Sequence, residues 1–229
     1  MNPVQQHEMK FADILASLIH DMKNSLWLVI NTLESLAGEM ESSADRQKLQ
    51  TLQHEAKRLN TNLIELLTLY KLENERIAAN IEELNLAEFI EELVLENRIG
   101  ADARGVELSW TCDDDLYGYF DEGLIRGVVN SVIGNGLRYT RSRLHLSGEE
   151  ASGFLVIRVE DDGAGYPQEM LAAQDAIDDH SALCEGRTRL GLYFAGMVAK
   201  LHRNQGKEGY IRLSNQGQLD GGCFSLYLP

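Results

Sequence analysis

The first third of the chain carries hydrophobic residues at the spacing of amphipathic helices. Over residues 45–73 the apolar positions alternate intervals of three and four, which is the seam of a coiled coil or helical bundle; they are Leu49, Leu52, Ala56, Leu59, Leu63, Leu66 and Tyr70. A looser seam runs through residues 8–37, at Leu15, Leu18, Met22, Leu26, Val29, Leu33 and Leu36. A short connection separates the two segments, so the pattern predicts an antiparallel helical hairpin. Because one hairpin cannot bury a wide apolar face, we expect a homodimer with a four-helix bundle.

From about residue 81 the pattern changes to short strands and helices in alternation. Strands are predicted at 106–110, 143–147, 154–162 and 221–229, and helices at 86–101, 121–138 and 188–203. Glycine follows the same division, since only Gly38 of the 20 glycines lies before residue 77. The prediction is therefore an α+β chain in two domains, a helical hairpin over residues 1–77 and an α/β sandwich over residues 78–229.

Composition and charge narrow the function classes. The chain has 229 residues, 44% of them hydrophobic, which is enough for ordinary cores. Its formal charge of −15 repels nucleic acid and anionic membrane surfaces. No run of about 18 apolar residues is present, and three widely spaced cysteines indicate neither a disulfide framework nor a clustered metal site. We expect a cytoplasmic protein whose partners are proteins or small molecules.

The helix over residues 8–37 gathers polar residues within one turn, in the stretch "LIHDMKNSL". One interpretation is a solvated helix face that happens to include a histidine. The other is that a carboxylate beside His20 fixes its tautomer and leaves Nε2 as a nucleophile for a phosphoryl group. Asp21 is adjacent to His20, and Asn24 lies one turn further along, where its carboxamide could orient a phosphate or a water.

Three stretches of the second domain have residue types suited to nucleotide binding. "NSVIGNGLRYT" carries Asn135, Arg138 and Tyr139, of which the carboxamide could coordinate Mg²⁺ and the guanidinium could meet phosphate. "DDGAGYP" carries Asp161, Gly163 and Gly165, a turn in which the carboxylate could accept from an exocyclic amine such as that of adenine. "RTRLGLYFAG" opens a helix with Leu190, Gly191 and Leu192, whose backbone N–H groups would favour phosphate. Each stretch alone is equally compatible with an ordinary turn or helix end.

In this order, the motifs resemble those of two-component sensor histidine kinases over nearly the entire chain. "HDMKNSL" is similar to the phosphoacceptor box, and the three later stretches are similar to the N box and the two glycine boxes. The resemblance implies a dimerisation and histidine phosphotransfer domain followed by an ATP-binding domain of the Bergerat type. It implies His20 as phosphoacceptor, Asp21 as its acid/base partner and Asn24 as a phosphatase-related carboxamide. It also implies ATP and Mg²⁺ as ligands, with Asn135 holding the metal and Asp161 reading adenine.

The sequence departs from the family pattern at several positions. Ser25 stands where a proline usually follows the phosphoacceptor motif. Ser131 occupies the place of the earlier N-box asparagine, and Asn130 is out of step by one residue. Arg187 and Arg189 replace the first two glycines of the second glycine box, and the segment before them is short, which predicts a small ATP lid.

These departures keep three functions open. The first is a histidine kinase that autophosphorylates His20 and passes the phosphoryl group to an aspartate of a response regulator receiver domain, which it also dephosphorylates. The second is a histidine phosphotransfer protein or regulator phosphatase with degenerate ATP binding. The third is a non-enzymatic dimeric adaptor. No transmembrane segment or sensor domain is recognisable in the sequence. We therefore expect the kinase to receive its input from a separate sensory protein or through its first ten residues.

Overall fold

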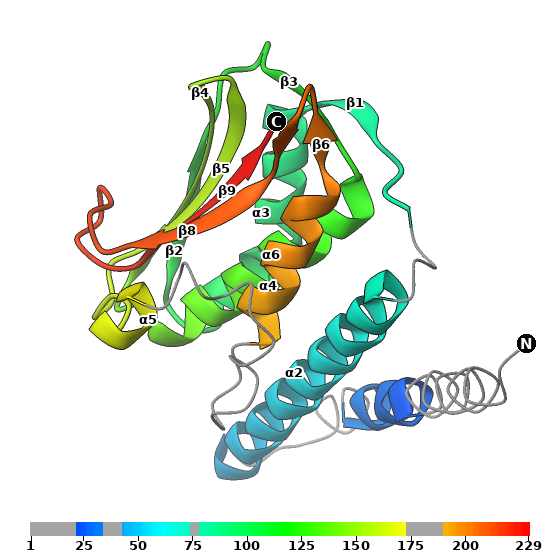
Figure 1. Ribbon diagram of the computed structural model, residues 1–229. Coiled ribbons are helices and arrows are strands. Elements are labelled where there is room, and N and C mark those ends of the chain that lie inside the picture. Colours follow the sequence, from blue (N-terminus) through cyan, green and yellow to red (C-terminus); the bar gives the residue numbers. More distant parts are fainter. Residues whose placement is uncertain (1–21, 34–42, 74–77, 173–189) are drawn as a thin grey trace, which may run out of the picture. The chain divides into compact units, whose positions relative to one another are not determined.

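The computed structural model describes residues 22–33, 43–73, 78–172 and 190–229. The chain divides into two compact units, Met1–Ile77 and Ala78–Pro229 (Figure 1). No helix within the described ranges combines the length and the apolar composition that crossing a bilayer requires.

The first unit consists of two helical stretches. Residues 22–33 are helical, and α2 spans Ser43–Glu73, which confirms a long helix over the stronger of the two predicted seams. In that seam Leu49 and Ala56 are buried, whereas Leu52, Leu59 and Leu66 are exposed. The dimeric four-helix bundle remains a prediction.

The looser first seam is described only in part. Its members Leu26 and Leu33 are half-buried, whereas Met22 and Val29 are each 48% exposed in the single chain. Ile30, which the prediction left out, is buried between Leu26 and Leu33 on the same side of the helix. Leu15, Leu18 and Leu36 lie outside the described residues.

The second unit is built on a five-stranded sheet with the order β2-β4-β5-β9-β8. The strands are β2 Glu107–Thr111, β4 Arg143–Ala151, β5 Phe154–Asp161, β8 Tyr210–Ser214 and β9 Cys223–Leu228. β2 pairs with β4 in parallel and the other pairs are antiparallel. Two small antiparallel pairs accompany the sheet, β1 Glu82–Asn85 with β3 Tyr117–Phe120, and β6 Arg203–Asn204 with β7 Lys207–Glu208.

Three helices cover one face of this sheet, as Figure 1 shows, and the other face carries no helix among the described residues. They are α3 Leu86–Asp102, α4 Glu122–Tyr139 and α6 Leu190–Leu201, while the short α5 Gln168–Ala172 follows β5. The core lies between the two layers and includes Ile90 and Leu93 of α3, Ile133 of α4 and the sheet residues Leu146 and Phe224, all fully buried. The result is a mixed, two-layer α+β unit, as the sequence predicted.

Local signals explain where α3 and α4 begin. The side chain of Asn85 accepts a hydrogen bond from the backbone N–H of Glu88, and the side chain of Asp121 accepts one from that of Leu124. Both are N-caps, which satisfy one of the amide groups that a helix start leaves without a partner. The predicted ranges 86–101 and 121–138 are thereby confirmed to within a residue or two.

A buried histidine joins the ends of α4 and α6. His202 Nδ1 lies 2.9 Å from the carbonyl oxygen of Val198, and its Nε2 accepts from the backbone N–H of Asp121 at 3.0 Å. These partners require the neutral tautomer with the proton on Nδ1. Burial lowers the pKa of His202, which keeps the ring in that neutral form. His202 therefore fixes the C-terminus of α6 at the N-terminus of α4.

Candidate functional site

The N-box residues lie in the last two turns of α4. Asn135, Arg138 and Tyr139 are exposed, while Leu137 is buried and anchors this end of the helix to the core. Ser131 is half-buried and precedes Asn135 by four residues, so the two share one side of the helix. The polar end of α4 thus presents a carboxamide and a guanidinium to the surroundings.

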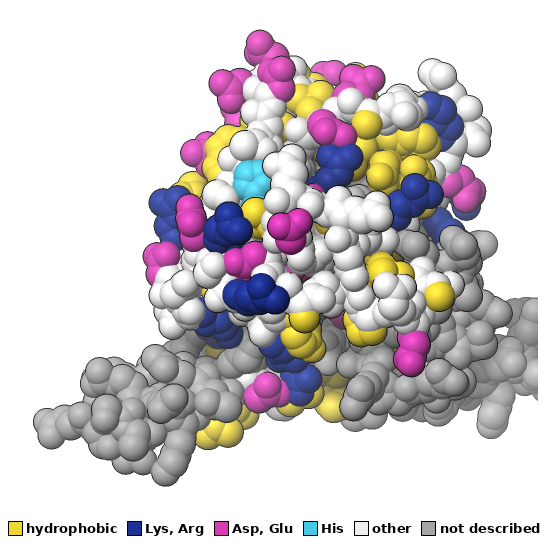
Figure 2. All heavy atoms as spheres, turned by 90° about the vertical axis from the view of Figure 1, so that its left-hand side faces the viewer, with side chains coloured by type: hydrophobic (Ala, Val, Ile, Leu, Met, Phe, Trp, Pro, Cys, Tyr) yellow, Lys and Arg dark blue, Asp and Glu magenta, His cyan; other side chains and the backbone are white. Residues whose placement is uncertain are grey.

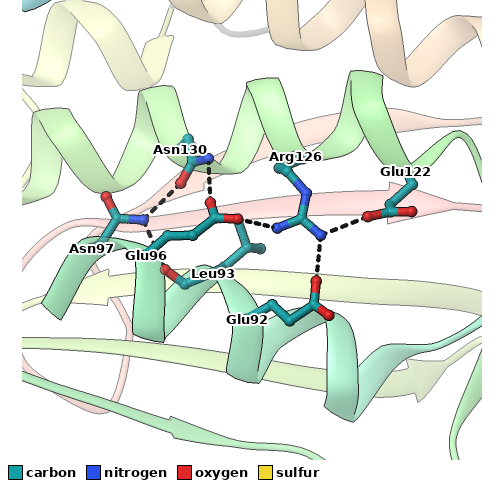
Figure 3. A network of polar contacts seen from close by, with 7 residues as sticks. All are labelled: Glu92, Leu93, Glu96, Asn97, Glu122, Arg126 and Asn130. Carbon is teal, nitrogen blue, oxygen red and sulfur yellow. Dashed lines mark hydrogen bonds and ion pairs between the residues drawn. The ribbon is translucent and has the colours of Figure 1, made fainter.

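Asn130 belongs to a different side of α4. Its Oδ1 accepts from Asn97 Nδ2 at 2.7 Å, and its Nδ2 donates to Glu96 Oε2 at 3.2 Å, both on α3 (Figure 3). Asn97 Nδ2 also donates to the carbonyl oxygen of Leu93. The amide of Asn130 is therefore engaged in the contact between two helices and does not substitute for the residue replaced by Ser131.

Arg126, one turn before Asn130, extends the same contact. Its guanidinium pairs with Glu92, Glu96 and Glu122 at 2.5–2.6 Å and lies 5.2 Å from the centre of the Phe89 ring. Only 20% of the Arg126 side chain is exposed. A planar guanidinium can serve several carboxylates and an aromatic face at once. This network fixes the position of α4, and hence of its polar C-terminal end, on α3.

The loop after α4 is held by a carboxylate that the sequence reading did not single out. Asp162 Oδ1 accepts from the hydroxyl of Thr140 and from the backbone N–H groups of Arg141, Ser142 and Arg143, at 2.6–3.1 Å. Its Oδ2 accepts from the Ser142 hydroxyl at 2.6 Å. Burial alone would raise the pKa of Asp162, but the hydrogen bonds from Ser142, Thr140 and the backbone outweigh it and lower the pKa well below its usual range.

Asp161, the preceding residue, points to the helix-covered side of the sheet, because side chains alternate along a strand. Its Oδ1 accepts from the backbone N–H of Gly163 at 2.7 Å and from that of Gly222 at 3.3 Å. The two adjacent aspartates thus have separate roles. Asp162 ties the end of α4 to β5, and Asp161 stands where the glycine turn and the segment before β9 meet.

The glycines of the D-x-G-x-G turn allow close packing at two points. A Cβ on Gly163 would lie 2.4 Å from the carbonyl oxygen of Tyr139, so only glycine fits between the turn and the end of α4. Gly165 has φ +76° and faces Asn215. Asn215 accepts from the backbone N–H of Tyr166 at 2.7 Å and donates to its carbonyl oxygen at 2.9 Å. The loop between β8 and β9 thereby holds the turn in place.

Leu190, Gly191 and Leu192 are half-buried and form the first turn of α6. Because the C-terminus of α6 is bonded to the N-terminus of α4 through His202, α6 runs back towards the C-terminal half of α4 (Figure 1). The second glycine box and the N box therefore lie on two packed helices. Arg187 and Arg189 lie outside the described residues.

The histidine motif is described only in part, since His20 and Asp21 lie outside the described residues. Asn24 is exposed on the helix of residues 22–33. The structure therefore places the end of α4 at Tyr139 beside the glycine turn of Asp161 and Gly163. A shared nucleotide site and the arrangement of the phosphoacceptor motif remain predictions.

The donor set fits a nucleotide better than a resident metal. In the described ranges no three His, Cys, Asp or Glu side chains are grouped closely enough to hold a metal ion. The carboxylate of Asp161 is an acceptor for an amine, and Asn135 offers one oxygen ligand. A Mg²⁺ ion at such a site would need further oxygens, which the phosphates of a nucleotide supply.

Comparison with known proteins finds relatives along most of the chain, although no protein-family model matches it. It is 24% identical over 201 residues to sensor protein SrrB of Staphylococcus aureus, covering 83% of this chain and 34% of SrrB. It is 25% identical over 224 residues to drug sensory protein A of Synechocystis, covering 88% of this chain and 33% of that protein. The chain thus spans about a third of the length of these relatives.

Solved structures share the fold. The histidine kinase AdeS of Acinetobacter baumannii superposes with a TM-score of 0.60 at 20% identity, over 91% of this chain and 96% of AdeS. Full-length ShkA in complex with AMPPNP gives a TM-score of 0.65 at 19% identity, over 95% of this chain and 45% of ShkA. The catalytic domain of histidine kinase ThkA gives 0.54 at 19% identity, over 66% of this chain and 95% of that domain.

Proposed function

Since the homologues of this chain are sensor histidine kinases, we propose that it transfers the γ-phosphoryl group of ATP to His20 and then to an aspartate of a response regulator. The observation that carries this proposal is the convergence at Asp161. The D-x-G-x-G turn, the end of α4 and the segment before β9 meet there, held by Asp162 and Asn215. The half-buried carboxylate of Asp161 in this polar junction suits the exocyclic amine of adenine.

Each side chain has a chemical task in this proposal. Asp161 accepts a hydrogen bond from the exocyclic amine of adenine. Asn135 would hold Mg²⁺, which when bound would neutralise part of the charge on the phosphates. Arg138 and the backbone N–H groups of Leu190, Gly191 and Leu192 would stabilise the remaining charge. Tyr139 lines the same edge at the end of α4.

The transfer itself requires a neutral imidazole. Nε2 of His20 attacks the γ-phosphorus, the bond to the β,γ-bridging oxygen breaks, and ADP leaves. The carboxylate of Asp21 accepts a hydrogen bond from Nδ1–H. This bond fixes the tautomer in which the lone pair is on Nε2. In the second step a receiver-domain carboxylate attacks the same phosphorus, the P–Nε2 bond breaks, and neutral His20 is the leaving group. Asn24, one turn further along the helix, orients a water that hydrolyses the phosphoaspartate of the regulator.

Dimerisation is the second part of the proposal. Leu52, Leu59 and Leu66 of α2 are spaced by one heptad and are 57%, 49% and 42% exposed in the single chain. Trp27 and Leu28 of the first helix are also exposed, at 60% and 63%. Large apolar side chains in such a stripe are the knobs of a helical interface. A second copy of the first unit, forming a four-helix bundle, would cover them.

A second candidate is a phosphotransfer protein or regulator phosphatase with weak ATP binding. The observation that favours it is the pairing of Asn130 with Asn97 and Glu96, which leaves Ser131 as the only side chain at the place of the missing asparagine. A dimeric adaptor without phosphoryl chemistry is the remaining alternative, and it predicts that changing His20 leaves function intact.

Calorimetric titration with Mg-ATP separates these candidates. Asp161→Asn keeps the bonds from Gly163 and Gly222 possible but replaces the carboxylate acceptor, so we expect affinity to fall by about tenfold or more. Asp220→Asn, the same change at an exposed position of the β8–β9 loop, is the control and should bind as wild type does. If wild type shows no binding, the chain is not an ATP-dependent kinase. If wild type binds and Asp161→Asn binds equally well, Asp161 is not the residue that reads adenine.

A further inference from the structure

The helix-free face of the sheet carries a second polar site. Figure 2 views this side, on which acidic and basic side chains are interspersed. Near the end of β2 the surface forms a hollow of about 490 Å³. Its walls come from β2, β4, β5 and the β8–β9 loop and include Thr111, Ser147, Glu149, Arg158, Glu160 and Gln218.

Glu160 is the unusual member of this wall. Only 5% of the residue is exposed, yet it is a carboxylate on the face opposite to the core. Its hydrogen bond from the backbone N–H of Gln218 to Oε2 is long at 3.4 Å, and its other partner, the thiol of Cys223, is a weak donor. Among the described residues no basic side chain forms an ion pair with it. A buried carboxylate in this state costs free energy unless a cation or stronger donors meet it.

The one basic residue of the wall is already paired. Arg158 donates to Glu149 at 2.7 Å, and these two charges cancel. Asp113, which lies at the rim, adds another negative charge. Two nearby thiols, those of Cys112 and Cys223, respond to this environment. Burial raises the pKa of each thiol, and the charge of a neighbouring carboxylate raises it further. The hollow as a whole is therefore negative.

We propose that this hollow is a binding site for a guanidinium or ammonium group, with Glu160 as its counter-charge. The remaining polar groups of the wall include the hydroxyls of Thr111 and Ser147 and the side-chain carbonyl of Gln218, all of which can accept hydrogen bonds. A guanidinium or ammonium group has donors only, so it matches these acceptors together with the carboxylate of Glu160. The source of the group is a free organic amine or a basic side chain of another protein.

The hollow and the edge formed by Asp161 share a loop. Asn215 holds Tyr166 on the helix-covered side, and three residues later the N–H of Gln218 meets Glu160 on the open side. Glu160 and Asp161 are themselves adjacent in β5 and point to opposite faces. An occupant of the hollow therefore contacts the same loop that positions the D-x-G-x-G turn.

The test uses agmatine, which carries a guanidinium and an ammonium group, and the capped tripeptide acetyl-Gly-Arg-Gly-amide. Each is titrated into the ¹⁵N-labelled full chain without nucleotide, following the amide signals of Gly217 and Gln218. We expect saturable shifts with at least one probe. Saturation by agmatine identifies a free amine as the source, and saturation by the tripeptide alone identifies a protein side chain.

Two variants test the role of the carboxylate. Glu160→Gln should weaken the probe by about tenfold or more, because the charge-assisted bonds are lost. Ser147→Lys should abolish binding by filling the hollow with its own ammonium group, and it decides the matter if Glu160→Gln does not fold. Glu150→Gln, an exposed glutamate outside the hollow, should bind as wild type does. The proposal is overturned if neither probe saturates, or if folded Glu160→Gln or Ser147→Lys binds like wild type. Because no nucleotide is involved, this result is independent of the kinase proposal.

Discussion

At the scale of single residues, two adjacent aspartates at the end of β5 have different roles: one is proposed to bind a ligand, and the other holds a loop in place. Asp161 faces the proposed nucleotide, and Asp162 takes five hydrogen bonds from the segment Thr140–Arg143. The sequence suggested Asp161 because the D-x-G-x-G spacing is local. It did not suggest Asp162, whose partners lie 19–22 residues earlier and reach it only when β4 pairs with β5.

The role of Asp162 predicts a measurable loss of stability. Asp162→Ala leaves several loop donors without a partner, so unfolding in urea at pH 7 should require about 2–3 kcal/mol less than for wild type. Asp114→Ala, at an exposed position before β3, is the control and should change stability little.

The same carboxylate predicts a dependence on pH. Because the pKa of Asp162 is lower in the folded than in the unfolded chain, its contribution is present above the unfolded value of about 4 and is lost as the pH falls below it. The stability difference between wild type and Asp162→Ala should therefore shrink between pH 5 and pH 3, these being about one unit either side of the unfolded value. A difference that stays constant over this interval would show that folding does not lower the pKa of Asp162.

At the scale of elements, α4 presents two functional sides. On one side, Arg126 and Asn130 contact α3, and Glu122 pairs with Arg126 within α4 (Figure 3). On another side, Ser131, Asn135 and Tyr139 recur at the same interval of four residues. The 3.6-residue period is local, so the sequence predicted the helix and its polar C-terminal end. The engagement of Asn130 with α3 depends on residues 33 and 34 positions away, which no local pattern encodes.

This division predicts opposite outcomes for neighbouring substitutions. Ser131→Asn restores a carboxamide one turn before Asn135, and we expect Mg-ATP to bind roughly threefold to tenfold more tightly, as one added hydrogen bond or metal contact allows. Asn130→Ala should lower the free energy of unfolding by about 1 kcal/mol and leave Mg-ATP affinity unchanged. Calorimetry and urea unfolding measure the two effects. An Asn130→Ala protein with normal stability and impaired nucleotide binding would reverse the assignment of the two sides.

The strands likewise show which elements a local sequence pattern can predict and which it cannot. The four strands predicted from apolar alternation are present, with β4 extending to Ala151. The pairs β1–β3 and β6–β7, and strand β8, were not predicted. Four of these five strands have two to four residues, too few for a periodic signal, and β8 is recognised only through its pairing with β9.

At the scale of the whole molecule, the exposed heptad stripe of α2 predicts a dimer. Leu59→Asp places a charge among apolar side chains and should dissociate the assembly, as sedimentation at micromolar concentration would show. Leu95→Asp is the matched control, because Leu95 is similarly exposed, at 54%, but lies on α3 in the second unit. A wild-type chain that sediments as a stable, folded monomer would contradict the bundle.

The central claim, that this chain is a histidine kinase acting through His20, is tested most directly by incubating the purified protein with γ-labelled ATP and Mg²⁺. We predict label on the protein that is labile in acid and stable in base, as phosphohistidine is. It should be absent from His20→Gln and retained in His7→Gln, a histidine outside the motif. Unlabelled wild type would leave the phosphotransfer or adaptor function, and label that persists on His20→Gln would contradict the assignment of the phosphoacceptor.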